Sequence, residues 1–191
     1  EGFVGDFVAH SRGVETTTGF ALWTALFMIS SVLRRDAWFK WIEGSPLLPN
    51  LYVVLVAPPG LVKKNTIMAM GRHIMDEMPA YIQDPGLSIY KKVTTFTDSI
   101  TPEGIRDVLT PTKQKIKYLD DNNEEVIQTI RRGSEVAFFV PELAVMLNKK
   151  RYNMGMIERL TSLYDGEDTA TSYTRGGGYV HLQNLYVTLL G

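Results

Sequence analysis

Residues 51–66, LYVVLVAPPGLVKKNT, constrain the fold of this chain more than any other segment. The apolar run Leu51 to Val56 predicts a buried β-strand, and continuous runs of this kind are typical of parallel sheets covered on both faces. A Pro-Pro-Gly turn and two lysines follow, and from Ile67 the pattern predicts a helix. The order of strand, tight loop, lysine and helix is that of a phosphate-binding loop.

The chemistry of such a loop depends on the helix that it feeds. Backbone N–H groups at a helix N-terminus point to one spot, where the helix dipole adds positive potential. A lysine there neutralises phosphate oxygens, and a hydroxyl can hold Mg²⁺. The standard pattern of this loop is G-x-x-x-x-G-K-[ST], and neither Lys63 nor Lys64 fits its lysine position cleanly. With Lys64 as that lysine, the Ser/Thr position holds Asn65 and Thr66 comes one step late. With Lys63 as that lysine, the Ser/Thr position holds Lys64. Both registers stay open, as does a strand followed by a proline turn and two solvated lysines.

Composition limits the classes of protein to consider. A length of 191 residues, 45% hydrophobic and 21% charged, is enough for one globular domain with a full core. The net charge of −1 gives no overall attraction to nucleic acid or membrane, so any such contact must be local. The chain has no cysteine, and its three histidines, His10, His73 and His181, lack the spacing of metal ligands. No signal peptide pattern follows Glu1, so we expect a cytoplasmic protein, in the host cell if a phage encodes it.

The order of predicted elements indicates the fold class. Helices are expected at 17–33, 67–78, 101–109, 143–147 and 154–164. Strands are expected at 37–42, 51–56, 87–97, 135–140 and 185–190, hairpins within 116–130 and 171–182, and a connector at 45–50. The helix at 17–33 is too short for a comfortable membrane span and reads as a buried core helix. Alternating strands and helices predict an α/β sandwich with a mainly parallel sheet and hairpin insertions.

The same pattern suggests a division of the chain. Residues 1–50 are expected to form a helical lead-in that packs on a core made by residues 51–191. The final predicted strand reaches the last residue, so we expect more chain beyond Gly191.

Two further residues are candidates for chemistry. Glu142 follows the apolar run VAFFV, at the place where nucleotide hydrolases carry acids that position water and help to hold Mg²⁺, although the preceding position is Pro141. The alternative is that Pro141-Glu142 simply opens a helix. Arg175, in SYTRGGG, is a candidate for contact with a nucleotide phosphate, in this subunit or a neighbouring one, or with a DNA backbone; it is otherwise an exposed surface arginine.

Six segments taken in order resemble a known family: FALWTALFMISSVLRRDAWFKW, LLPNLYVVLVAPPGLVKKNT, DSITPEG, VPELAVML, LTSLYDGEDTATSYTRGGG and LQNLYVTLLG. From about Phe20 to Gly191 the chain resembles the helicase-like P-loop ATPase domain of phage and mobile-element primase-helicase replication proteins. The resemblance implies a RecA-like or AAA-type fold that binds ATP and Mg²⁺. It also implies a homo-oligomeric ring, expected to be hexameric, that unwinds DNA during replication and contacts single-stranded DNA. No membrane association is expected.

Specific roles follow from the resemblance. The form APPG-x-x-x-K-x-T favours Lys64 as the phosphate lysine, and Glu142 matches the catalytic acid. Asn184 or Thr188 matches the polar sensor of the γ-phosphate. Asn65 or Thr66 would lie near Mg²⁺. The full set expected to bind nucleotide is Pro59, Gly60, Leu61, Val62, Lys63, Lys64, Asn65, Thr66, Asn184 and Thr188, with Lys64, Glu142 and Arg175 acting in catalysis.

Other functions remain compatible with these residues. The irregular loop also fits a catalytically weakened nucleotide-binding or structural assembly domain. A packaging ATPase or a small-molecule kinase would use the same layout, and stimulation by DNA or by a metabolite separates those classes.

Overall fold

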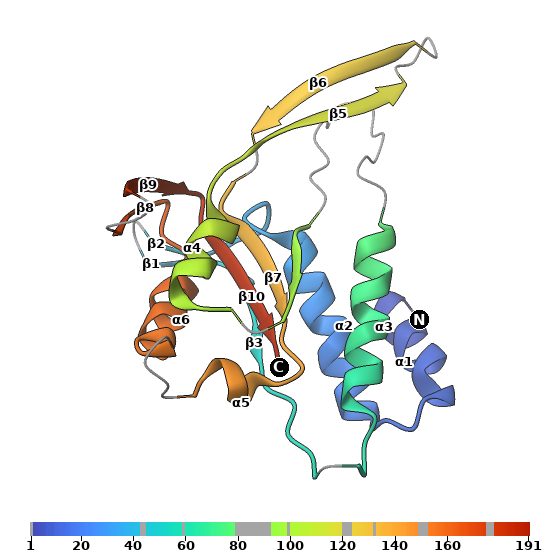
Figure 1. The fold of residues 1–191 in the computed structure, drawn as a ribbon. Helices are drawn as coiled ribbons and strands as arrows, with labels where there is room; N and C mark the ends of the chain where they lie inside the picture. The colour runs from blue at the N-terminus through green and yellow to red at the C-terminus, as the bar shows by residue number, and fades with distance from the viewer. Residues whose placement is uncertain are drawn as a thin grey trace.

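One parallel sheet lies between two layers of helices, and antiparallel hairpins extend from this body (Figure 1). The computed structural model describes residues 2–42, 45–58, 60–78, 93–98, 100–119, 124–131, 133–148, 153–174 and 178–191. In chain order the elements are α1 (Phe3–His10), η1 (Ser11–Gly13), α2 (Thr18–Leu33), β1 (Phe39–Ile42), β2 (Ser45–Leu47), β3 (Tyr52–Val53), α3 (Lys64–Glu77), β4 (Thr95–Thr97), α4 (Pro102–Leu109), β5 (Lys113–Leu119), β6 (Glu125–Arg131), β7 (Glu135–Phe139), α5 (Leu143–Met146), α6 (Met156–Tyr164), β8 (Thr169–Thr174), β9 (Gly178–Gln183) and β10 (Tyr186–Leu190).

The central sheet has the strand order β3-β10-β7-β4, and all its neighbouring strands run parallel. Strand β10 is the last in sequence but lies between β3 and β7, where Leu190 pairs with Val53 on one side and with Phe139 on the other. The predicted α/β class with a mainly parallel sheet and hairpin insertions is confirmed. Because the strands are parallel, their carboxyl ends share one edge of the sheet, where ligands bind in folds of this type.

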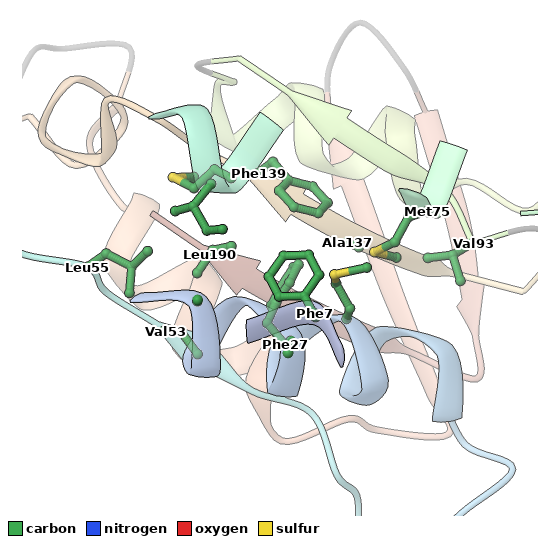
Figure 2. Packing of buried hydrophobic residues seen from close by; sticks show 14 residues of the cluster. Phe7, Phe27, Val53, Leu55, Met75, Val93, Ala137, Phe139 and Leu190 are labelled. Carbon is green, nitrogen blue, oxygen red and sulfur yellow. The ribbon is translucent and has the colours of Figure 1, made fainter. Parts of the chain in front are cut away.

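One face of the sheet packs on α1, α2 and α3. Successive side chains of a strand point to opposite faces, so Ala137 and Phe139 of β7 enter this layer. The ring of Phe27 from α2 meets that of Phe139 edge-on, with centroids 5.0 Å apart. Figure 2 shows Phe7, from α1, in the same cluster. The segment before residue 50 therefore contributes to the hydrophobic core of the sheet.

The opposite face packs on α4 and α6. Val136 and Phe138 of β7 point into this layer, where they join Ile105 and Leu109 of α4 and Leu163 of α6. The ends of the helices follow the sequence signals. The Thr17 hydroxyl accepts a hydrogen bond from the Phe20 N–H at the start of α2, and the Thr101 hydroxyl accepts one from the Gly104 N–H at the start of α4.

Other boundaries differ from the predictions. Strand β3 covers only Tyr52–Val53 of the predicted strand 51–56, and α3 begins at Lys64, three residues before the predicted Ile67. The predicted hairpins at 116–130 and 171–182 form as β5-β6 and β8-β9. The prediction of a connector at 45–50 was wrong at its start, because β2 (Ser45–Leu47) pairs with β1 despite a proline, which an edge strand tolerates.

Across the described part of the chain, no helix combines the length and apolar character needed to cross a bilayer.

Candidate phosphate-binding site

The candidate site lies where β3, β10 and β7 end together. The N–H of Leu55, just after β3, donates to the carbonyl of Gly191 at 2.7 Å, and the N–H of Val140, just after β7, donates to that of Leu190 at 2.8 Å. The loop after β3 leads to the N-terminus of α3 at the same end of the molecule as the C-terminus (Figure 1). The predicted phosphate loop and the predicted acid therefore occupy one edge of the sheet.

The loop after β3 turns sharply before α3 begins. Gly60 has φ +76°, a left-handed conformation that favours glycine, and the N–H of Leu61 donates to the carbonyl of Pro58 at 3.4 Å. Helix α3 then starts at Lys64 without a side-chain cap. The first N–H groups of an α-helix have no partner within the helix. The Lys64 N–H donates to the Val62 carbonyl at 2.8 Å, so the donors that this terminus can offer to an anion are the N–H groups of Asn65 and Thr66.

A cavity of about 490 Å³ opens in front of this helix terminus. Its size is in the range of pockets that hold small-molecule ligands. The loop, the first turn of α3 and the end of β7 all contribute to its wall. The lining residues are Ala57, Pro58, Gly60, Val62, Lys63, Lys64, Asn65, Thr66 and Glu142.

The two lysines point to different partners. The Lys64 amine donates a hydrogen bond to the backbone carbonyl of Pro141 at 2.8 Å, so its side chain spans from the loop to the end of β7. The Lys63 amine lies 3.5 Å from the carboxylate of Glu15, and the Lys63 side chain is 57% exposed. The Lys63 N–H also donates to the Glu15 carbonyl, at 2.9 Å. Of the two lysines, Lys64 is the one whose amine reaches the strand end that carries Glu142.

Glu142 stands between two cavities. It lines the cavity of the loop and also a neighbouring one of about 470 Å³, which Thr97 and Asp98 line from the end of β4. Glu142 occupies the N-cap position of the short helix α5, but its side chain makes no capping hydrogen bond. The structure therefore brings Lys64 and Glu142 to the same cavity.

The residues predicted to sense the γ-phosphate lie elsewhere. Thr188 is fully buried in the middle of β10, where its hydroxyl lies 2.7 Å from that of Ser31 on α2. Asn184 precedes β10 and so lies at the amino edge of the sheet, opposite the loop. It has a φ of 54°, and its N–H donates to the Asp168 carbonyl. Neither residue lines the loop cavity. Pro59 and Arg175 fall outside the described residues.

Two residues near the site were not identified from the sequence. Glu15 contacts Lys63 through its carboxylate and its backbone carbonyl, and nothing in the sequence relates these positions. Asp98 lines the same cavity as Glu142 because β4 and β7 are neighbours, with Thr97 paired to Phe139. An acid directly after a predicted strand was the available signal for Asp98, since carboxyl ends of parallel strands meet at one edge.

Residues with oxygen-bearing side chains line the cavity, and their chemistry fits Mg²⁺. Asn65, Thr66 and Glu142 contribute amide, hydroxyl and carboxylate oxygens to the wall, and Mg²⁺ prefers oxygen ligands. Among the described residues, no group of three or more histidine or acidic side chains is placed to hold a metal ion.

Comparison of the chain with protein family models, with curated proteins and with solved structures gave no match.

Proposed function

We propose that this chain binds a nucleoside triphosphate, expected to be ATP, and hydrolyses its terminal phosphate. The observation that carries the proposal is the shared cavity of Lys64, the N-terminus of α3 and Glu142 at the carboxyl edge of a parallel sheet. Anion-binding groups come from one strand end and an acid from another, and nucleotide hydrolysis requires both.

Binding uses the loop and the first turn of α3. The triphosphate lies against the N–H groups at the start of α3, which the helix dipole makes electropositive. Lys64 exchanges its hydrogen bond with the Pro141 carbonyl for phosphate oxygens, whose negative charge makes them stronger acceptors. Mg²⁺, held by Asn65 or Thr66, would neutralise charge on the phosphates.

The loop cavity provides the space for the reaction. The loop after β3 and Glu142 after β7 both line this cavity of about 490 Å³, so a phosphoryl group and a water molecule would lie between Lys64 and Glu142. The water oxygen attacks the γ-phosphorus, Glu142 accepts the proton of that water, and the bond to the β,γ-bridging oxygen breaks to release the diphosphate.

The resemblance to primase-helicase proteins gives this activity a context. We propose that hydrolysis drives movement along single-stranded DNA in a ring of identical subunits, as in the ATPase domain of a replicative helicase. The parallel sheet supports the α/β part of this proposal. A second function, nucleotide binding without turnover in an assembly domain, is favoured by one observation: Pro141 offers no carboxylate beside Glu142.

Replacing Glu142 tests the proposal against this second function. Because Glu142 is exposed, we expect Glu142→Gln to leave the fold and the affinity for Mg-ATP within about threefold of the unsubstituted protein. General bases contribute about 10²- to 10⁴-fold to rate, so we expect phosphate release to fall at least 100-fold.

Phosphate release is measured with and without single-stranded DNA, and ATP affinity is measured by titration with a fluorescent analogue. Turnover that persists in Glu142→Gln contradicts the assigned role. Binding without turnover in the unsubstituted oligomer selects the assembly function. Stimulation by a metabolite instead of DNA indicates a small-molecule kinase.

A further inference from the structure

The outward face of the β8-β9 hairpin carries two exposed tyrosines and no acid. Cross-strand pairing places six residues on this face, since Thr169 pairs with Gln183, Thr171 with His181 and Tyr173 with Tyr179. All six are exposed. The face therefore presents hydroxyl, amide, imidazole and phenol groups to solvent, and none carries a negative charge.

The other face of this hairpin explains why the first is free. Leu182 is fully buried, and its neighbours Ala170 and Val180 pack against the core beside α4 and α6. Because successive strand residues alternate between faces, anchoring one face holds the other toward solvent. The root of the hairpin is also held, since the Arg35 guanidinium donates to the Leu185 carbonyl at 3.0 Å and pairs with Asp168.

The two tyrosines form the prominent feature of the exposed face. Tyr173 is 60% exposed and Tyr179 is 74% exposed, and their ring centroids lie 4.8 Å apart at an interplanar angle of 45°. Exposed aromatic rings on a rigid strand are the elements on which unpaired bases stack. Stacking on aromatic rings does not depend on base identity, because every base has a π-face.

We propose that the outward face of β8-β9 binds single-stranded nucleic acid by stacking bases on Tyr173 and Tyr179. Thr171 and His181, whose side chains lie 3.5 Å apart beside the rings, supply hydrogen bonds to phosphate or base edges. The choice of single-stranded DNA as the partner rests on the proposed function, because a motor that moves on single-stranded DNA must contact it. The aromatic face supplies such a contact.

The exposed face of β8-β9 and the candidate phosphate site lie at opposite edges of the sheet. The β9 strand continues through Asn184 into β10, and β10 ends at the candidate phosphate site (Figure 1). The nucleic acid would therefore bind at the amino edge of the sheet and the nucleotide at the carboxyl edge. One central strand connects the two sites.

The test uses a fluorescein-labelled 20-nucleotide poly(dT) strand and fluorescence anisotropy. Loss of base–aromatic stacking weakens binding about fivefold or more for each ring, so we expect Tyr173→Leu/Tyr179→Leu to weaken binding at least 25-fold. The matched control is Tyr173→Phe/Tyr179→Phe, which keeps both rings and is expected to bind within about threefold of the unsubstituted protein. Because few ionic contacts are involved, raising salt from about 50 to about 200 mM is expected to weaken binding less than tenfold.

Three results would overturn the proposal: no binding of poly(dT) by the unsubstituted protein, equal binding by the leucine variant, or equal loss in the phenylalanine variant. A leucine variant that changes the oligomeric state in sedimentation, with poly(dT) binding unchanged, would assign the face to a contact between copies of the chain. Titration of the same variants with an ATP analogue shows whether the nucleotide site, at the other edge of the sheet, still binds. Loss of poly(dT) binding can then be told apart from loss of nucleotide binding.

Discussion

The buried pair of hydroxyls on Ser31 and Thr188 gives a prediction that distinguishes a core role for Thr188 from a phosphate-sensing one. The Ser31 hydroxyl donates to the Phe27 carbonyl at 2.8 Å and lies 2.7 Å from the Thr188 hydroxyl. A serine hydroxyl has one proton, so Ser31 uses it on Phe27 and Thr188 must donate to Ser31. Both residues are buried, with 2% and 0% exposure.

The direction of that hydrogen bond makes the two single substitutions unequal. Thr188→Val removes a donor and leaves the Ser31 proton satisfied, so the expected loss is about 1 kcal/mol of unfolding free energy. Ser31→Ala leaves the Thr188 proton buried without its acceptor, which costs about 1–3 kcal/mol. Removing both hydroxyls leaves no orphaned donor, so the double variant is expected to lose less than the sum of the single losses, with a coupling of about 1 kcal/mol.

Urea unfolding of the unsubstituted protein, the two single variants and the double variant measures these free energies. Steady-state ATP hydrolysis by the same proteins tests whether Thr188 senses phosphate. A core role predicts that Thr188→Val keeps the hydrolysis rate and the ATP affinity within about twofold. Additive losses of stability would refute the hydrogen-bond assignment. A large fall in hydrolysis at nearly unchanged stability would restore Thr188 as the sensor.

Two further predictions concern packing and pH. A Cβ on Gly71 of α3 would lie 2.7 Å from Thr24 Cγ2 of α2, so Gly71→Ala is expected to cost about 1–3 kcal/mol of unfolding free energy and to lower the melting temperature. The control is Gly5→Ala on α1, where a Cβ meets open space and the expected effect is a stabilisation of about 0.5–1 kcal/mol. Equal effects of the two substitutions in thermal unfolding would contradict the α2-α3 packing. Burial raises the pKa of Tyr186 to about 12, so its protonated form is favoured in the fold, and stability is expected to fall by about 1.4 kcal/mol per pH unit from pH 10 toward 12. This slope is the contribution of Tyr186 alone, so Tyr186→Phe should lack it in alkaline urea titrations, and an unchanged slope would contradict the assignment.

Much of the fold follows from local patterns that the structure leaves intact. The buried strands β7 and β10 come from continuous apolar runs, and α2 and α4 begin at capping threonines. The run Leu51–Val56 was harder to interpret, because it forms an edge strand. Val53 and Leu55 are buried, but Val54 and Val56 are 57% and 82% exposed. An apolar run alone does not show that only one set of its side chains is covered.

The parts of the site were predictable from the sequence, whereas the residues alone left its register open and only the resemblance favoured Lys64. The loop and Glu142 follow strands that any reading of the sequence would place in one parallel sheet. The different partners of Lys63 and Lys64 could not be predicted, because Glu15 is distant in sequence and becomes a neighbour of Lys63 only when the N-terminal segment packs beside the loop. The place of Thr188 likewise depends on Ser31, across the interface of α2 with β10.

The most direct test of the phosphate site is a titration of a fluorescent ATP analogue with Mg²⁺ against the unsubstituted protein, Lys64→Ala and Lys63→Ala. Hydrogen bonds to charged groups contribute about 1.5–3 kcal/mol, so losing the Lys64 contact should weaken binding more than tenfold. The Lys63 amine lies in an exposed pair with Glu15, where solvent and salt screen its charge, so Lys63→Ala should change ATP affinity by less than about fivefold. Tight binding by Lys64→Ala, or no binding by the unsubstituted protein, would contradict the account.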